Sequence, residues 1–174
     1  MTQFKNAFAL GDNVNDLPMP PVKVYIGCSW FNEQQREHLK KGLAAIEANP
    51  SISRKYSHFP LDFQYKGLDV AEHPELLHDV EWQARTFNSD IEGIIGSDLC
   101  LMLYLPSFPD DGGAFELGYA KGIGKQSVMV VPDDDIDNLN LMLAYGVTRV
   151  IKLSDLSTFD FRHVHAGTYK GLVH

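Results

Sequence analysis

The chain has 174 residues, a formal net charge of −8 at pH 7, 44% hydrophobic residues and 22% charged residues. These values are typical of a water-soluble globular protein with one domain and a substantial core. The acidic residues are spread along the chain, which argues against a nucleic-acid partner, because binding phosphates needs clustered Lys and Arg. The composition favours a small ligand.

The N-terminal part and the cysteines bear on cellular location. Residues 1–20 carry Asp12 and Asp16 and no apolar run, so we expect an N-terminal extension rather than a signal peptide, with residues 21–174 as the domain. No segment approaches the ~20 apolar residues of a transmembrane helix, so no membrane partner is expected. Cys28 and Cys100 lie in apolar segments and are predicted to be buried structural thiols of a cytoplasmic protein.

Strand-like and helix-like segments alternate along the chain. Apolar β-type runs predict strands, and apolar residues at helical spacing predict helices. The alternation predicts an α/β fold in one domain, a mostly parallel sheet with helices on both faces. In chain order we predict a strand at 22–26, a helix at 33–48, a strand at 58–63, a helix from 74 or 78 to 94, a strand at 98–105, a helix at 113–123, a strand at 127–131, a helix at 139–145 and a strand at 147–151.

Two helices carry further signals. Asn32 is a candidate N-cap for the helix at 33–48. The helix before the strand at 98–105 has an apolar stripe, which predicts a core-facing side. Asp90 borders that stripe, and the pattern leaves open whether it is a solvated or capping residue or a functional one. The stripe consists of Val80, Ala84, Phe87, Ile91 and Ile94.

The segment from Asp110 to Ala120 is the main candidate for function. It follows the strand at 98–105 and opens a helix, so its carboxylates fall at the carboxyl end of a strand, where open α/β sheets bind ligands. Glu116 is the one carboxylate there with apolar and small neighbours. The histidine spacings match no metal site, and there is no G-x-S-x-G nucleophile motif. We therefore predict carboxylate chemistry with no metal and no cofactor.

Several motifs in this order resemble the nucleoside 2-deoxyribosyltransferases. The resemblance runs from about Val22 to the C-terminus. Within the family, the sequence is similar to the branch that accepts both purines and pyrimidines. It implies a flavodoxin-like fold, deoxynucleosides and free nucleobases as small-molecule partners, and a homo-oligomer, a hexamer built from dimers whose subunits share sites. The motifs are VYIG at 24–27, Trp30-Phe31, PLDFQYKG at 60–67, EHPE at 72–75, FNSD at 87–90, DDGGAFELG at 110–118 and NLM at 140–142.

The resemblance also implies roles for matching residues. Glu116 corresponds to the nucleophile that forms a glycosyl ester, and Asp90 to the acid that protonates the leaving base. Tyr25 is similar to a tyrosine that hydrogen-bonds the catalytic Glu. The implied substrate-binding residues are Asp110, Gln64, Trp30, Phe31, Met142 and Asn140, the last supplied by a neighbouring subunit.

General chemistry agrees with the two carboxyl roles and leaves alternatives. Retention at a glycosidic carbon needs a carboxylate nucleophile and a second carboxyl acid. An Asp acting as that acid near neutral pH needs a raised pKa, which burial beside Phe87 would give. The alternative functions are an N-glycoside hydrolase of deoxynucleosides or deoxynucleotides and, third, a non-catalytic binding module.

The aromatic residues and the C-terminus also leave alternatives. Trp30, Phe31 and Tyr65 either line the site or pack in the hydrophobic core. The family typically ends in a tyrosine, whereas this chain ends in His174, which either takes over that role or lies in a disordered tail.

Overall fold

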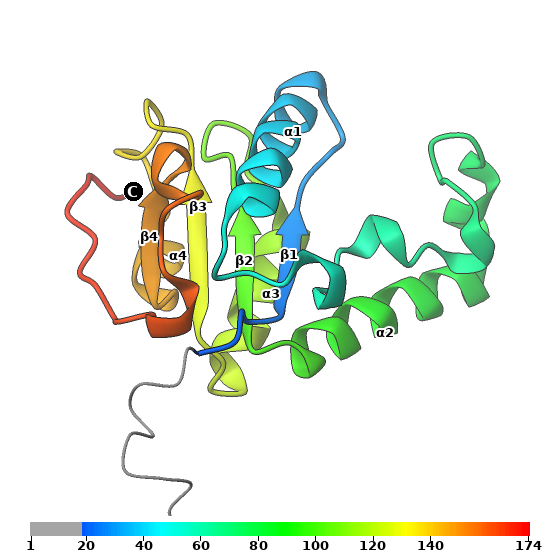
Figure 1. The fold of residues 1–174 in the computed structure, drawn as a ribbon. Helices are drawn as coiled ribbons and strands as arrows, with labels where there is room; N and C mark the ends of the chain where they lie inside the picture. The colour runs from blue at the N-terminus through cyan, green and yellow to red at the C-terminus, as the bar shows by residue number, and fades with distance from the viewer. Residues whose placement is uncertain (1–18) are drawn as a thin grey trace, which may run out of the picture.

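A four-stranded parallel sheet forms the centre of the computed structural model, which describes residues 19–174. The strands lie in the order β1-β2-β3-β4 (Figure 1). Their bounds are Val24–Cys28 for β1, Leu99–Leu103 for β2, Ser127–Val131 for β3 and Arg149–Lys152 for β4. The predicted N-terminal extension at 1–20 falls almost wholly outside the described residues and stays a prediction.

A fifth predicted strand, at 58–63, is wrong except at its first residue. The segment beside β1 makes only two isolated parallel bridges, Val22 with Ile52 and Tyr25 with His58. The chain then turns at Pro60 into a one-turn 3-10 helix, Pro60–Asp62. Proline has no N–H for a ladder and fixes φ, so pairing with β1 stops there. The bridges lie at the free edge of β1, where a flavodoxin-like sheet has its second strand.

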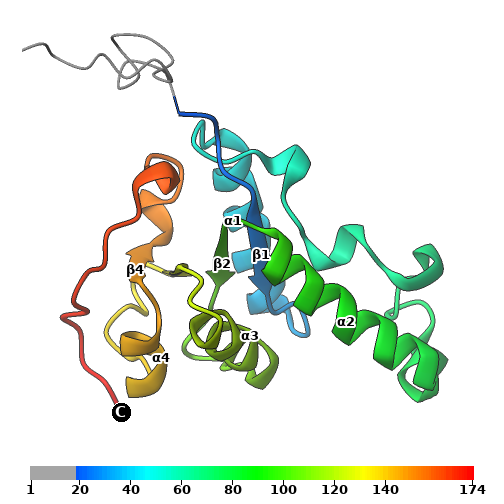
Figure 2. The ribbon, with the colours of Figure 1, turned by 90° about the horizontal axis from the view of Figure 1, so that it is seen from below.

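Helices cover both faces of the sheet, as predicted. On one face, α1 (Glu33–Ala48) packs with the alternating strand residues Val24, Ile26 and Leu101. On the other face are α2 (Val80–Gly96), α3 (Asp111–Gly122) and α4 (Leu141–Gly146), which can be followed in Figure 2. They contribute Ile94, Leu117, Ala120 and Ala144 to a core built on Tyr25, Cys100, Met102 and Met129.

The start of α1 confirms the predicted cap. The Asn32 side chain accepts from the Gln35 backbone N–H at 2.8 Å, and the Gln35 side chain accepts from the Asn32 N–H at 3.2 Å. This is a capping box, which satisfies backbone donors that the helix itself leaves free. Gln35 also accepts from the Phe31 N–H at 2.9 Å, so the cap fixes the backbone of the segment between β1 and α1.

The apolar stripe of α2 is buried at its C-terminal end alone, so the prediction of a core-facing stripe is wrong for most of its length. Ile94 is fully buried, but Val80 is 75% exposed and Phe87 54% exposed. Figure 1 shows the reason: the N-terminal half of α2 extends beyond the edge of the sheet. Within residues 19–174, no helix is both long and apolar enough to cross a membrane.

The topology marks a position for ligands. From β1 the chain first goes to the edge segment on one side, and it later returns through α2 to β2 on the other side. The connections therefore diverge at the carboxyl ends of β1 and β2, which is the switch point where open α/β sheets bind ligands. The residues after β1 and β2 lie there.

Candidate active site

A cavity of about 260 Å³ opens at this switch point. It gathers residues from β1, from the loop at 60–70, from α2 and from the start of α3. Seven of the predicted site residues line it together. They are Tyr25, Trp30, Phe31, Gln64, Asp90, Asp110 and Glu116.

Glu116 lies in the second turn of α3, against the backbone of β1. A Cβ atom on Gly27 would lie 2.9 Å from Glu116 Oε2 and 2.4 Å from Met102 Cε. The absence of a side chain at Gly27 therefore makes room for the carboxyl group. Tyr25 is fully buried, and its hydroxyl lies close enough to Glu116 for each group to perturb the pKa of the other. The hydroxyl has no hydrogen-bond partner of normal geometry among the described residues, so the implied bond to Glu116 is not formed in the single chain.

The carboxyl groups of Glu116 and Asp90 have raised pKa values. Burial, followed by the charges of Asp90 and Asp110, raises the pKa of Glu116 to about 8, although the Tyr25 hydroxyl opposes this. Burial alone raises the pKa of Asp90 to about 6. Between these values the pair holds one proton and one negative charge. Because Glu116 has the higher pKa, in the single chain this proton lies on Glu116 and the charge on Asp90.

Asp110 combines a structural position with a place in the cavity wall. It is the N-cap of α3, and its carboxylate accepts from the backbone N–H groups of Gly112 at 3.2 Å and Gly113 at 3.1 Å. The hydroxyl of buried Ser29 donates to its Oδ2 at 2.9 Å. Sequence reasoning missed Ser29, although it directly follows β1 as Asp110 follows β2. Parallel strands end at one edge of a sheet, so this placement was the available signal.

Aromatic side chains form much of the cavity wall, and Trp30 also packs against the core. Trp30 and Phe31 stack with ring centroids 5.4 Å apart, and Phe31 is 69% exposed in the single chain. Gln64 and Tyr65 come from the loop after the edge segment and also line the cavity. The Tyr65 hydroxyl is buried with no hydrogen-bond partner among the described residues.

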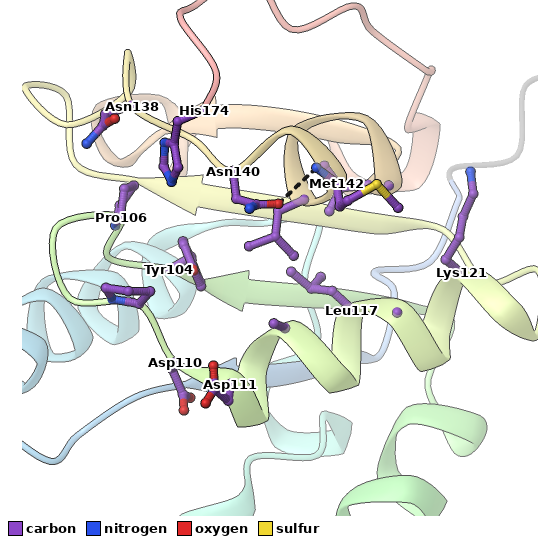
Figure 3. Close-up of a pocket in the computed structure, with 16 residues that line it drawn as sticks. Tyr104, Pro106, Asp110, Asp111, Leu117, Lys121, Asn138, Asn140, Met142 and His174 are labelled. Carbon is purple, nitrogen blue, oxygen red and sulfur yellow. Dashed lines mark hydrogen bonds between the residues drawn. The ribbon is translucent and has the colours of Figure 1, made fainter.

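The remaining predicted residues, Asn140, Met142 and His174, do not line the Glu116 cavity. They line a second cavity of about 530 Å³ between α3 and α4 (Figure 3). The C-terminal tail is held there, since the His174 N–H donates to the Leu139 carbonyl and the Leu141 N–H to the His174 carbonyl. The alternative of a disordered tail is therefore wrong. Asp110 lines both cavities and marks where they adjoin.

Comparisons with known proteins give this site a family. The model of the nucleoside 2-deoxyribosyltransferase family matches residues 24–146. The chain belongs to this family. It is 40% identical to the nucleoside deoxyribosyltransferase of Lactobacillus leichmannii, over 90% of this chain and 100% of the relative. With that of Lactobacillus johnsonii it shares 44% identity, over 83% of this chain and 98% of the relative.

A solved structure supports the fold. The 2-deoxyribosyltransferase of Bacillus psychrosaccharolyticus superposes with a TM-score of 0.69 at 23% identity, covering 85% of this chain and 99% of that one. The predicted α/β, flavodoxin-like architecture is thereby confirmed for this chain.

Cys28 lines the candidate site, although it was predicted to be a buried structural thiol. Cys28 is not a plain structural thiol, because it is partly exposed and lines the Glu116 cavity. Burial and the neighbouring carboxylates raise the pKa of its thiol to about 12, so it stays protonated and unreactive. Cys100 is fully buried, as predicted. Within residues 19–174, no group of three or more His, Cys, Asp or Glu side chains is arranged to hold a metal ion.

Proposed function

We propose that this protein exchanges the nucleobase of 2′-deoxyribonucleosides through a covalent deoxyribosyl ester on Glu116. The carrying observation is that Glu116 and Asp90 line one cavity and hold a single proton between about pH 6 and 8. A retaining reaction at a glycosidic carbon needs this pair, one carboxylate to attack and one acid to protonate the leaving group. Family membership and the names of its relatives point to the same reaction.

The two steps assign a role to each carboxyl group. Because Glu116 has the higher pKa, the proton of the pair first passes from Glu116 to Asp90. Ionised Glu116 then attacks the anomeric carbon as the bond to the base breaks, and the Asp90 proton passes to the departing nitrogen. The electrons of the broken bond stay on the base. In the second step an incoming base attacks the ester and returns its proton to Asp90. Tyr25 places a hydroxyl donor beside Glu116, and ionised Glu116 stabilises the positive charge that develops on the sugar.

The cavity wall favours transfer over hydrolysis. The ester lasts until a base arrives only if water is kept away from it. Trp30, Phe31 and Tyr65 present apolar surface around the cavity. Gln64 lies in the same wall, where its amide can hydrogen-bond to the base. The hydrolase alternative uses the same nucleophile, but it stays second because it needs water to reach the ester. We also propose a cytoplasmic location, because Cys28 and Cys100 are both free thiols.

Incubation with thymidine and free adenine tests the proposal. We expect deoxyadenosine and thymine to appear together, and neither to appear with Glu116→Ala. Release of thymine without deoxyadenosine would establish the hydrolase instead. If no product forms from thymidine, deoxyinosine is offered as donor, which separates a purine preference from the predicted use of both base classes.

We further propose that a second copy of the chain completes each site. Asn140, Met142 and His174 are exposed around the second cavity, so they can serve a neighbouring subunit more readily than Glu116 of their own chain. An apolar face on α2 and α3 lies unpartnered: Phe87 and Phe115 are 54% and 53% exposed, with rings 6.0 Å apart. Exposed apolar patches of this kind mark protein interfaces.

Subunit complementation tests this sharing. Glu116→Ala and Asn140→Ala are each expected to be inactive alone. When the two variants are co-expressed, about half of the isologous dimers contain one copy of each. In such a mixed dimer, one of the two sites takes an intact Glu116 from the Asn140→Ala subunit and an intact Asn140 from the Glu116→Ala subunit. About a quarter of all sites therefore regain activity. If both variants are inactive alone and the mixture is also inactive, Asn140 serves its own subunit.

A further inference from the structure

An imidazole fills the space between the strand that carries Tyr25 and the helix that carries Asp90. His58 lies directly opposite Tyr25 in a parallel bridge, with the Ile26 N–H donating to its carbonyl at 2.8 Å and its own N–H donating to the Val24 carbonyl at 2.9 Å. The Tyr25 and His58 rings stack at 5.7 Å with planes 14° apart. On its other side, the His58 ring stacks on Phe63 at 4.4 Å and 5°.

The same ring also touches α2. A Cβ atom on Gly93 would lie 2.4 Å from His58 Cδ2 and 2.5 Å from Cγ, so the imidazole packs directly on the helix backbone. Gly93 lies three residues after Asp90, about one helical turn away. The ring thus contacts the partner of the nucleophile and the helix of the acid at the same time.

The imidazole takes no part in the hydrogen bonding that holds the core together. Its Nε2 is buried and has no hydrogen-bond partner among the described residues. Burial lowers the pKa of His58, and Asp62 in the following 3-10 helix opposes this, so the ring is neutral at neutral pH. On α2, Glu92 and Gly93 line the same shallow surface hollow as His58. A buried polar atom with no partner costs stability, so the ring occupies this place for another reason than hydrogen bonding.

We propose that His58 is a positioning residue, a wedge that fixes the Tyr25–Glu116 pair relative to Asp90 and keeps water from reaching Tyr25 from the α2 side. The inference rests on the proposed function. Without the ring, a gap joins the surface hollow between the edge segment and α2 to Tyr25, and α2 loses its contact at Gly93. Displacements of about 1 Å at a reacting pair reduce turnover by up to 100-fold.

Two single variants separate the ring from its nitrogen. For His58→Ala we expect kcat to fall about 10- to 100-fold with little change in KM, because ground-state contacts with the nucleoside are elsewhere. For His58→Phe we expect nearly wild-type kcat and a higher Tm, since the ring is kept and an unpartnered nitrogen is removed. If His58→Phe is as impaired as His58→Ala, the nitrogen is what matters and the wedge is refuted.

The pH profile distinguishes positioning from mere stability. Water beside Tyr25 weakens the burial that raises the pKa of Glu116, so the alkaline limb of kcat/KM moves to lower pH in His58→Ala and stays in place in His58→Phe. The control is Ile46→Val, in the core on the opposite face of the sheet, which lowers Tm without moving the limb. An unmoved limb in His58→Ala would refute the wedge, whereas wild-type protein inactive with every donor would refute the proposed function.

A double-mutant cycle gives an independent test. Gly93→Ala puts a methyl group into the imidazole and displaces the ring, so it is expected to impair kcat as well. In His58→Ala/Gly93→Ala the methyl group fits the space left by the ring, so the double variant is no worse than His58→Ala alone. Additive losses would show that the two residues act separately and would overturn the inference.

Discussion

Replacement of Gly27 by alanine tests the placement of Glu116, the proposed nucleophile, with a single methyl group. The new Cβ would lie 2.9 Å from Glu116 Oε2, about 0.5 Å short of the 3.4 Å at which ordinary contact begins. It would also lie 2.4 Å from Met102 Cε, but a methionine end group can rotate away. The carboxyl group of Glu116 has less freedom, because it packs between α3 and the backbone of β1.

The displacement sets the size of the effect. If a misplacement of about 1 Å costs up to 100-fold in rate, half of that distance costs about tenfold, or ~1.4 kcal/mol of transition-state stabilisation. Because the nucleophile acts in the transition state, the loss is expected in kcat and hardly in KM. Overpacking of the core adds about 1–3 kcal/mol of lost stability.

Initial rates of deoxyadenosine formation from thymidine and adenine measure this effect. The matched control is Gly122→Ala in the last turn of α3, where a Cβ meets nothing within 4 Å. We expect the control to keep wild-type kcat. A folded Gly27→Ala protein with kcat within about twofold of wild type would refute the placement of Glu116 against β1.

Four further predictions concern single groups of the site and its supports. The pH profile of kcat/KM is expected to be bell-shaped with limbs near 6 and 8, because activity needs one proton on the Glu116–Asp90 pair. In Asp90→Asn, kcat is expected to fall about 10²- to 10⁴-fold. The Glu116 limb is expected to move to lower pH, because the negative charge of Asp90 no longer raises the pKa of Glu116. A profile without an acidic limb would contradict the first part. Ser29→Ala removes a 2.9 Å hydrogen bond to Asp110 and is expected to lower stability by about 1–3 kcal/mol in denaturant unfolding; an unchanged midpoint would contradict it. Asn32→Ala loses the cap of α1, about 1 kcal/mol, and lowers Tm by about 2–4 °C in calorimetry. Cys28, with its thiol pKa raised to about 12, is expected to react with iodoacetamide far more slowly at pH 8 than a free thiol, and fast labelling would show that it is ionised.

The fold was largely predictable because its signals are local. The strand at 127–131 has the predicted bounds, and α1 begins after Asn32 as its capping residue indicates. The edge segment at 58–63 was not predictable in this way, because its apolar residues suit a strand while Pro60 ends the pairing. The prediction for the stripe of α2 failed for another reason. Helical periodicity shows that one face of a helix is apolar, but it does not show whether other parts of the same chain cover that face.

The site was predictable in its acids and less so in its supports. Glu116 and Asp110 stood out because their segment follows a buried strand, and the structure brings them together with Asp90 and Tyr25 in one cavity. Ser29 and His58 act through contacts between segments far apart in the chain, and such contacts leave no local pattern. Asn140, Met142 and His174 could be named from the family resemblance, but their separation from Glu116 became visible only in the fold.

The position of Asp90 links the acid to the exposed half of α2. Its helix is buried at Gly93 and Ile94, and one turn before Asp90 it exposes Phe87. Burial within the single chain raises the pKa of Asp90. In the proposed oligomer, a second copy that covered Phe87 would remove more water from around Asp90 and would raise this pKa further. An interface over this face of α2 would therefore make the proposed acid more fully protonated at neutral pH.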